Sequence, residues 1–188
     1  IAQQVAEKAE MQNAMIFLSG YGIALNLGAK IYQQYGDNVY RILKENPYKM
    51  AEDIAGVGFR TADEIAGKIG IAVDSEFRIK SGLSYVLNQA TAEGHVYLPE
   101  PVLLRRGQEL LGVEPERMQK SLLAMPIDKK AVIRELPAER EGDEPLRIVY
   151  ASQYYYLELS TARMLHELNI TCEEDREAIE KRIGKIEK

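Results

Sequence analysis

The sequence predicts a mainly α-helical protein that also contains a small α+β region. Apolar residues recur at helical intervals over most of the chain, as Ile65 and Ile69 do. Two Gly-x-Gly triplets, at residues 20–22 and 56–58, interrupt such patterns, which resume a few residues later. Short strand-like runs occur only between residues 95 and 151. Helices therefore dominate the predicted fold, and the strands are confined to one part of it.

The first of two expected helical hairpins lies near the start of the chain. Helical patterns over residues 5–17 and 24–35 flank the triplet at residues 20–22. Gly36 is expected to end the second of these helices. Asp37 can then cap a short connecting helix. The two hairpins are thus predicted to be joined by a helical connector.

The second hairpin has clearer start and stop signals. Asn46-Pro47 begins its first helix, because a proline at the first helical position loses no hydrogen bond. After the triplet at residues 56–58, Thr61 and Glu64 have the spacing of a capping box. Gly70 closes this last helix. Residues 1–75 are therefore predicted to form a tandem helix-hairpin-helix domain.

From residue 76 the pattern changes to helix, strand, helix, helix, strand, charged loop and strand. This order is typical of a winged helix, so residues 76–151 are predicted to form a winged-helix-like domain. Residues 154–168 are helical again, and residues 172–188 form a charged amphipathic tail. The winged-helix elements are expected over residues 79–90, 95–99, 103–111, 115–125, 130–136 and 146–151, with the loop at 137–145.

Composition restricts the function classes. The 188-residue chain is 46% hydrophobic and 28% charged, as is usual for a soluble globular protein, with a net charge of −5. No apolar run approaches the roughly 20 residues of a membrane span, and no signal peptide is visible, so a cytoplasmic protein is expected. Cys172, His95 and His166 are too few for a disulfide framework or a metal cluster. The first residue is Ile and not Met, so a fragment of a longer protein is expected.

The triplet at Gly56, Val57 and Gly58 has a physical explanation. A tight turn between antiparallel helices needs glycine, and its amides then point outward at the start of a helix. Unpaired N–H groups and the helix macrodipole favour an anion there, such as a nucleic-acid phosphate. Arg60 and Thr61 can add a charge and a hydroxyl, while Val57 points inward. A net acidic protein could hold a DNA backbone in this way.

The first triplet, Gly20, Tyr21 and Gly22, repeats the pattern less completely. It lacks a threonine cap, and Gly28 inside the following helix costs about 1 kcal/mol relative to alanine. The alternative is that both triplets only end one helix and start another. The first hairpin is therefore open to either interpretation, whereas the second favours phosphate binding.

The winged-helix region supplies secondary candidates for DNA contact. Arg117 and Lys120 lie on the exposed face of the third helix of this region, and Arg140 lies in the charged loop. Acidic residues surround Arg140, so the winged-helix region is expected to be a spacer or a docking surface and not a DNA-binding domain. Residues 154–156, three tyrosines, could stack on unpaired bases, but packing at a domain interface explains them as well.

Three stretches of the chain resemble the N-terminal region of RecD-type (RecD/TraA family) DNA helicases. They are ENPY at residues 45–48, AEDIAGVGFRTADEIA at 51–66 and EGHVYLP at 93–99. The resemblance covers about residues 17–168. It implies a superfamily-one motor that uses ATP to move 5′→3′ on single-stranded DNA, in recombination and repair, and some relatives are exodeoxyribonuclease V α subunits. Residues 152–188 would then be the helical start of a truncated motor domain.

The chain departs from this family in lacking a P-loop, G-x-x-x-x-G-K-[ST]. Around Gly67-Lys68, Ala62 takes the place of the first glycine and Ile69 that of the Ser or Thr. The pair Gly184-Lys185 does not fit the motif either. No catalytic residues, cofactor or metal are therefore expected in this chain, and ATP and magnesium are expected only for the full-length protein.

Two functions are compatible with the sequence. The first is a DNA-binding region that grips single-stranded or junction DNA without sequence specificity and contacts its own C-terminal motor domain. The second is a protein-interaction module in which the hairpins are purely structural. A repair nuclease is discounted, because no metal-binding carboxylate motif is present.

Overall fold

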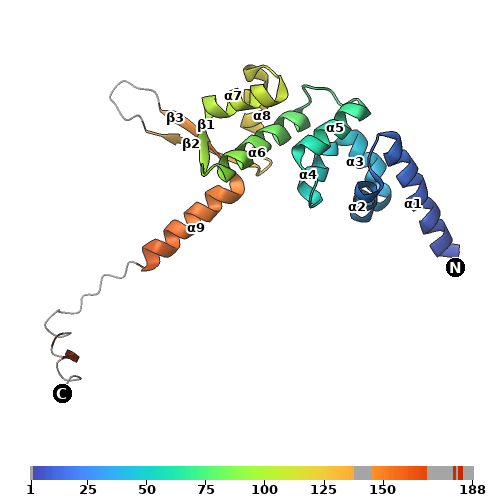
Figure 1. The fold of residues 1–188 in the computed structure, drawn as a ribbon. Helices are drawn as coiled ribbons and strands as arrows, with labels where there is room; N and C mark the ends of the chain where they lie inside the picture. The colour runs from blue at the N-terminus through green and yellow to red at the C-terminus, as the bar shows by residue number, and fades with distance from the viewer. Residues whose placement is uncertain (1, 138–144, 169–179, 181, 184–188) are drawn as a thin grey trace. The chain divides into compact units, whose positions relative to one another are not determined.

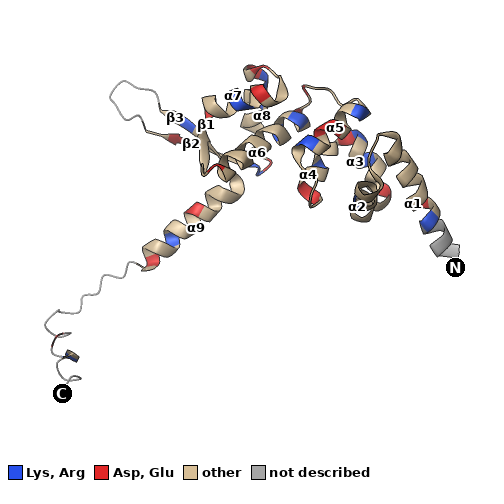
Figure 2. Ribbon diagram, viewed as in Figure 1, with Lys and Arg blue, Asp and Glu red and all other residues tan. Residues whose placement is uncertain are grey.

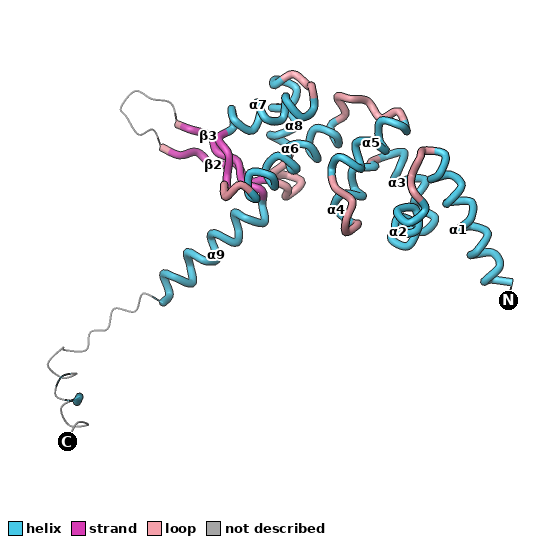
Figure 3. Tube along the Cα trace, viewed as in Figure 1, coloured by secondary structure: helices cyan, strands magenta, loops and turns pink. Residues whose placement is uncertain are grey.

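The fold was obtained as a computed structural model, which describes residues 2–137, 145–168, 180, 182 and 183, with side chains from residue 8 onward. The chain divides into two compact units, residues 1–152 and 153–188. Helices make up most of the first unit, and its strands form one small sheet (Figure 1 and Figure 3). The prediction of a mainly α-helical fold with a small α+β region is confirmed.

Two helical hairpins form the first half of this unit, as predicted. Gly36 follows the second helix directly, while the helix expected after Asn46 is divided into a 3-10 turn and a short α-helix. The elements are α1 (Ala2–Gly20), α2 (Leu25–Tyr35), η1 (Gly36–Asn38), α3 (Val39–Glu45), η2 (Pro47–Lys49), α4 (Met50–Asp53) and α5 (Phe59–Ile69).

One apolar core holds both hairpins together. Leu18 and Ile31 contribute from the first hairpin, Ile54 and Ile65 from the second, and Leu43 from the connecting helix α3. Each of these side chains is less than a tenth exposed. Side chains of both hairpins belong to one cluster, so the hairpins do not form separate cores. Because burying one such side chain contributes about 1.5 to 3 kcal/mol, the two hairpins stabilise each other.

The second half of the unit has the element order of a winged helix. Its three strands pair antiparallel in the order β1-β3-β2, so the last strand lies between the other two. Leu98 and Ile133 both pair with Val149; Leu98 and Val149 are buried, and Ile133 is half-buried. The elements are α6 (Glu76–Ala92), β1 (Tyr97–Pro99), α7 (Glu100–Leu111), α8 (Pro115–Ala124), β2 (Ala131–Leu136) and β3 (Leu146–Ala151).

Helices α6 and α7 approach closely at a glycine. A Cβ atom on Gly82 would lie 2.6 Å from Cδ2 of Leu111. We expect Gly82→Ala to lower the free energy of unfolding by about 1 kcal/mol, because the overpacking cost exceeds the gain in helix propensity. Urea denaturation measures this change. Gly67→Ala is the control, since its Cβ would meet nothing within 4 Å, and it should stabilise the protein; equal stabilisation by both variants would contradict the prediction.

The helix predicted over residues 154–168 is present as α9 (Ser152–Leu168). Cys172 and most of the predicted tail lie outside the described residues. Within the described part of the chain, no helix is long and apolar enough to cross a membrane, and no cluster of three metal-ligating side chains occurs. Large apolar side chains are exposed along α9, namely Tyr156, Leu157, Leu159, Met164, Leu165 and Leu168.

Candidate nucleic-acid interface

The second hairpin bends through a tight turn that depends on glycine. The amide of Val57 donates to the carbonyl of Ile54 at 3.0 Å, which closes a four-residue turn. Gly56 occupies the third position of this turn with φ at 89°, a conformation that other residues rarely adopt. The side chain of Val57 is only 5% exposed and belongs to the hairpin core. Val57 therefore points inward, as predicted.

The start of α5 leaves backbone amides without acceptors. Gly58 precedes the helix with extended backbone (φ −96°, ψ 174°) and offers no side chain to cap it. The amide of Ala62 donates to the Gly58 carbonyl at 3.1 Å. The amides of Phe59, Arg60 and Thr61 therefore have no intrahelical partner. Gly58 and Arg60 are exposed, and apart from the chain neighbours of Gly58 no described atom lies within 4 Å of a Cβ position there, so an anion can reach these donors.

The predicted capping box between Thr61 and Glu64 is wrong. Helix α5 begins at Phe59, so Thr61 is its third residue and not its cap. Glu64 instead pairs with Lys68 at 2.9 Å. The helix starts early because the Phe59 ring is buried and stacks on Tyr48, with the ring centroids 6.0 Å apart. Tertiary packing thus sets the helix start and leaves it uncapped.

The first hairpin has the same geometry at a different point in its sequence. Gly22 has φ at 71°, Ile23 is 6% exposed within the shared core, and Ala24 precedes α2 with extended backbone. Neither Ala24 nor Gly58 provides a side-chain cap. Gly22, Ile23 and Ala24 therefore correspond to residues 56–58.

The predicted alignment of the two glycine triplets is consequently wrong by two residues. Gly20 ends α1, and the ring of Tyr21 is half-buried, 5.1 Å from that of Phe17. Only Gly22 of the first triplet lies where its counterpart, Gly56, lies in the second turn. DNA contact by Gly20, Tyr21 and Gly22 stays a prediction.

The two turns lie in a part of the chain that matches a known family. Residues 7–97 match the family described as the ATP-dependent RecD2 DNA helicase HHH domain, where HHH denotes helix-hairpin-helix. Residues 7–97 are therefore named the RecD2-type region, after the domain that they match. The ATP-dependent RecD2 DNA helicase of Deinococcus radiodurans is 30% identical over 83 residues. The alignment covers 44% of this chain but only 12% of that protein, so the chain spans a small part of its relative.

The match confirms the resemblance to the N-terminal region of RecD-type helicases. It includes both hairpins, the whole of α6 and the start of β1. The RecD2-type region thus continues into the helix that begins the winged-helix part. The domain boundary at residue 75 stays a prediction.

Within the RecD2-type region, Arg78 of α6 links the second hairpin to the winged-helix part. Its Nε donates to Asp63 Oδ1 at 2.8 Å, and its Nη2 donates to Oδ2 at 3.1 Å. Its Nη1 donates to the carbonyls of Val73 at 2.8 Å and Leu111 at 2.9 Å. The hydroxyl of Tyr48 donates to the same carboxylate at 2.7 Å. Asp63 thus accepts from two other elements at once.

This network shifts the ionisation of its members. Burial alone would raise the pKa of Asp63, but hydrogen bonds from Arg78 and Tyr48 outweigh it, and the pKa lies below its usual value. Burial, followed by the hydrogen bond to Asp63, raises the pKa of Tyr48 far above its usual value. At neutral pH Asp63 is therefore charged and Tyr48 is a donor. No local sequence pattern predicts this cluster, because Asp63 and Arg78 lie on different helices.

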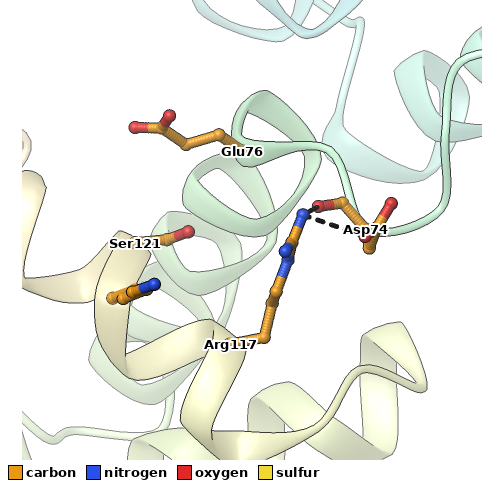
Figure 4. A pocket seen from close by; sticks show the side chains of 5 residues that line it. Asp74, Glu76, Arg117 and Ser121 are labelled. Atoms are coloured by element: carbon orange, nitrogen blue, oxygen red, sulfur yellow. Dashed lines mark hydrogen bonds and ion pairs between the residues drawn. The ribbon is translucent and has the colours of Figure 1, made fainter.

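The secondary DNA-contact candidates lie outside the hairpin turns, and acidic side chains lie beside those that the structure describes. Arg117 forms an ion pair with Asp74 at 2.9 Å and points toward it (Figure 4). Lys120 is exposed, and Arg140 lies outside the described residues. Arg117 and Lys120 line a cavity of about 280 Å³ together with Asp74 and Glu76, whose negative charges oppose a phosphate. DNA contact by Arg117, Lys120 and Arg140 stays a prediction.

Charge is mixed over the described helices. Lysines and arginines are interspersed with acidic residues along the described ribbon, with no continuous basic stretch there (Figure 2). The chain as a whole carries a net charge of −5. Any contact with a phosphate backbone must therefore rely on local donors, such as the uncapped helix starts of the RecD2-type region.

Proposed function

We propose that this chain is the DNA-binding N-terminal region of a RecD2-type helicase and that its hairpin turns hold the sugar-phosphate backbone. The observation that carries this proposal is the pair of uncapped helix starts, at α2 and α5. Each directly follows a turn with a positive-φ glycine and a buried apolar residue. Such helix starts favour phosphate through both their free amides and the helix macrodipole.

The second hairpin would make the stronger contact. Arg60 and Thr61 stand in the first turn of α5, where the guanidinium and the hydroxyl add to the backbone donors. Bonds to a charged phosphate are shorter and stronger than those between neutral groups. Because Gly56 and Gly58 have no side chains, they do not block a phosphate from these donors. The second hairpin therefore offers amides, a charge and a hydroxyl to one phosphate.

Binding of this kind does not depend on base sequence. Phosphate contacts set the position and orientation of a nucleic acid, whereas base edges carry the sequence information. The donors proposed here are backbone amides, one arginine and one hydroxyl at helix ends. We therefore expect similar affinity for single strands or junctions of different sequence, and a strong dependence on salt.

The winged-helix part would connect the hairpins to an ATP-driven motor. A motor of the 5′→3′ superfamily-one type is what the RecD resemblance implies, and its ATP and magnesium would bind outside this sequence, which has no P-loop. The exposed apolar side chains of α9 support packing against such a domain. We also place the protein in the cytoplasm, as expected from its sequence.

A protein-interaction module is the second candidate. The net charge of −5 and the exposed apolar side chains of α9 are the observations that favour it. In that case the hairpins would be structural only. Titration of labelled single-stranded, duplex and junction DNA at low salt distinguishes the two, because absence of binding to all three would support the interaction module.

Arg60→Ala tests the contact itself. We expect several-fold weaker DNA binding at low salt and a slope of log affinity against log salt that is smaller by about one, because one phosphate contact is lost. Fluorescence anisotropy over a salt series measures both quantities. Arg41→Ala is the matched control, since Arg41 is an exposed arginine on the connecting helix α3. Equal effects of the two substitutions would contradict a specific role for the hairpin.

A further inference from the structure

We propose that Lys68 supplies the positive charge for a phosphate contact at the first hairpin, so that α5 serves both hairpins. The inference rests on the proposed function, in which the turns hold a DNA backbone. It assigns a DNA-contacting role to a lysine of the second hairpin's helix that points toward the turn of the first.

The position of the ammonium group carries this inference. Nζ of Lys68 lies 3.1 Å from the point that a Cβ atom on Gly22 would occupy, and its Cε lies 3.8 Å away. Apart from Gly22 and its two chain neighbours, the described atoms within 4 Å of that point belong to Lys68. The side chain is 42% exposed. A cation therefore lies directly beside the turn and is accessible from solvent.

The first hairpin does not supply this charge itself. The first turn of α2 contains Leu25, Asn26 and Leu27, none of which is basic. Asn26 stands at the position that Arg60 takes in α5, two residues after the helix cap. The first turn of α2 by itself therefore offers a phosphate neutral donors only. Lys68 thus replaces, from another helix, the arginine that the second hairpin carries in its own sequence.

The core fixes where Lys68 points. Ile65 is buried in the hairpin core, and Ile69 packs against it, so the rotation of α5 about its axis is set by these two residues. Glu64 holds the ammonium group at 2.9 Å across one helical turn. Exposed pairs of this spacing are weak, so a phosphate can compete with Glu64 for the lysine.

The arrangement also indicates the size of the ligand. Arg60 and Lys68 lie eight residues apart on one helix, or about 12 Å at 1.5 Å per residue. Phosphates along one strand of a duplex are spaced about 3.4 Å along the helix axis. At roughly this separation the two cations would contact different phosphates of a nucleic acid and not the same phosphate. The ligand is thus a polynucleotide backbone and not a mononucleotide.

Lys68→Gln tests the proposal. We expect the slope of log affinity against log salt to fall by about one and DNA binding at low salt to weaken several-fold. Lys68→Arg keeps the charge and should keep the slope. Lys49→Gln is the matched control, because Lys49 is 49% exposed, has an i,i+4 carboxylate partner in Asp53 and does not approach Gly22. Thermal melting should show that all three variants remain folded.

The outcomes separate this inference from the proposed function. If the unmodified protein binds DNA and Arg60→Ala reduces the slope, but Lys68→Gln behaves like Lys49→Gln, only the role of Lys68 is overturned. If the unmodified protein binds no DNA at low salt, the proposed function fails and the role of Lys68 fails with it. A reduced slope for Lys68→Gln that Lys68→Arg restores supports the proposal.

Discussion

Gly58→Val should remove most DNA binding, by tenfold or more at low salt, while the protein stays folded. The backbone of Gly58 is extended, with φ −96° and ψ 174°, which suits a β-branched residue. Among the described residues, no atom other than those of Gly58 and its chain neighbours lies within 4 Å of the new Cβ position. The side chain at a helix cap lies over the first-turn amides, so the valine methyl groups would exclude a phosphate oxygen from them.

The measurement combines DNA titration with urea denaturation. We expect stability to fall by no more than about 1 kcal/mol, the usual cost of a poor helix cap. Gly56→Val provides the contrast, because Gly56 has φ at 89° and a β-branched residue there strains the turn itself. A folded Gly58→Val protein that binds DNA as tightly as the unmodified protein would show that the amides of α5 do not bind the phosphate.

Arg78→Met should lower the free energy of unfolding by about 2 to 3 kcal/mol. The substitution keeps much of the side-chain volume but removes four hydrogen bonds, two to Asp63 and one each to the carbonyls of Val73 and Leu111. The side chains of Arg78 and Asp63 are only 13% and 25% exposed. Hydrogen bonds to charged groups contribute about 1.5 to 3 kcal/mol, and leaving a partly buried carboxylate without its cation adds to the loss.

The pH dependence of this effect has a definite sign. Because the folded-state pKa of Asp63 is lowered, its contribution to stability is present above the pKa of the unfolded state, about 3.9. This contribution is lost as the pH falls through the lower folded-state pKa. The stability difference between the unmodified protein and Arg78→Met should therefore shrink below about pH 4. Urea denaturation at pH 7 and at pH 3 measures both differences.

Arg106→Met is the control for Arg78→Met. Arg106 also pairs with a carboxylate at 2.8 Å, but its partner Glu93 is 51% exposed. Exposed pairs contribute about 0 to 1 kcal/mol, so this variant should lose little stability. If both substitutions cost the same amount at pH 7, the Arg78 network does not link the hairpins to α6 as described.

Local signals in the sequence predicted the hairpin helices and the winged-helix order well. The helical spacing around Ile65 and the break at residues 56–58 both correspond to observed elements. Gly36, Gly70 and Gly112 each end or follow a helix, because glycine adopts the positive φ that these ends require. Such features depend on a few neighbouring residues, and so they can be recognised without knowledge of the fold.

Two features that depend on packing were predicted wrongly. The glycine pattern placed the first turn at residues 20–22, but burial of Ile23 in the shared core moves it to residues 22–24. The spacing of Thr61 and Glu64 predicted a cap, but burial of Phe59 starts the helix two residues earlier than Thr61. In both cases an apolar residue that the core requires overrides a local preference.

By itself, the sequence determined the helix boundaries set by glycine and proline, the winged-helix order, the absence of a P-loop and the resemblance that the RecD2 family match confirmed. Only the tertiary structure decided which residues of each turn face outward, that Arg78 joins α6 to Asp63, and that Lys68 lies beside Gly22. Those contacts join residues far apart in the chain, and their geometry depends on how the helices pack around one core. A local pattern carries no information about such packing.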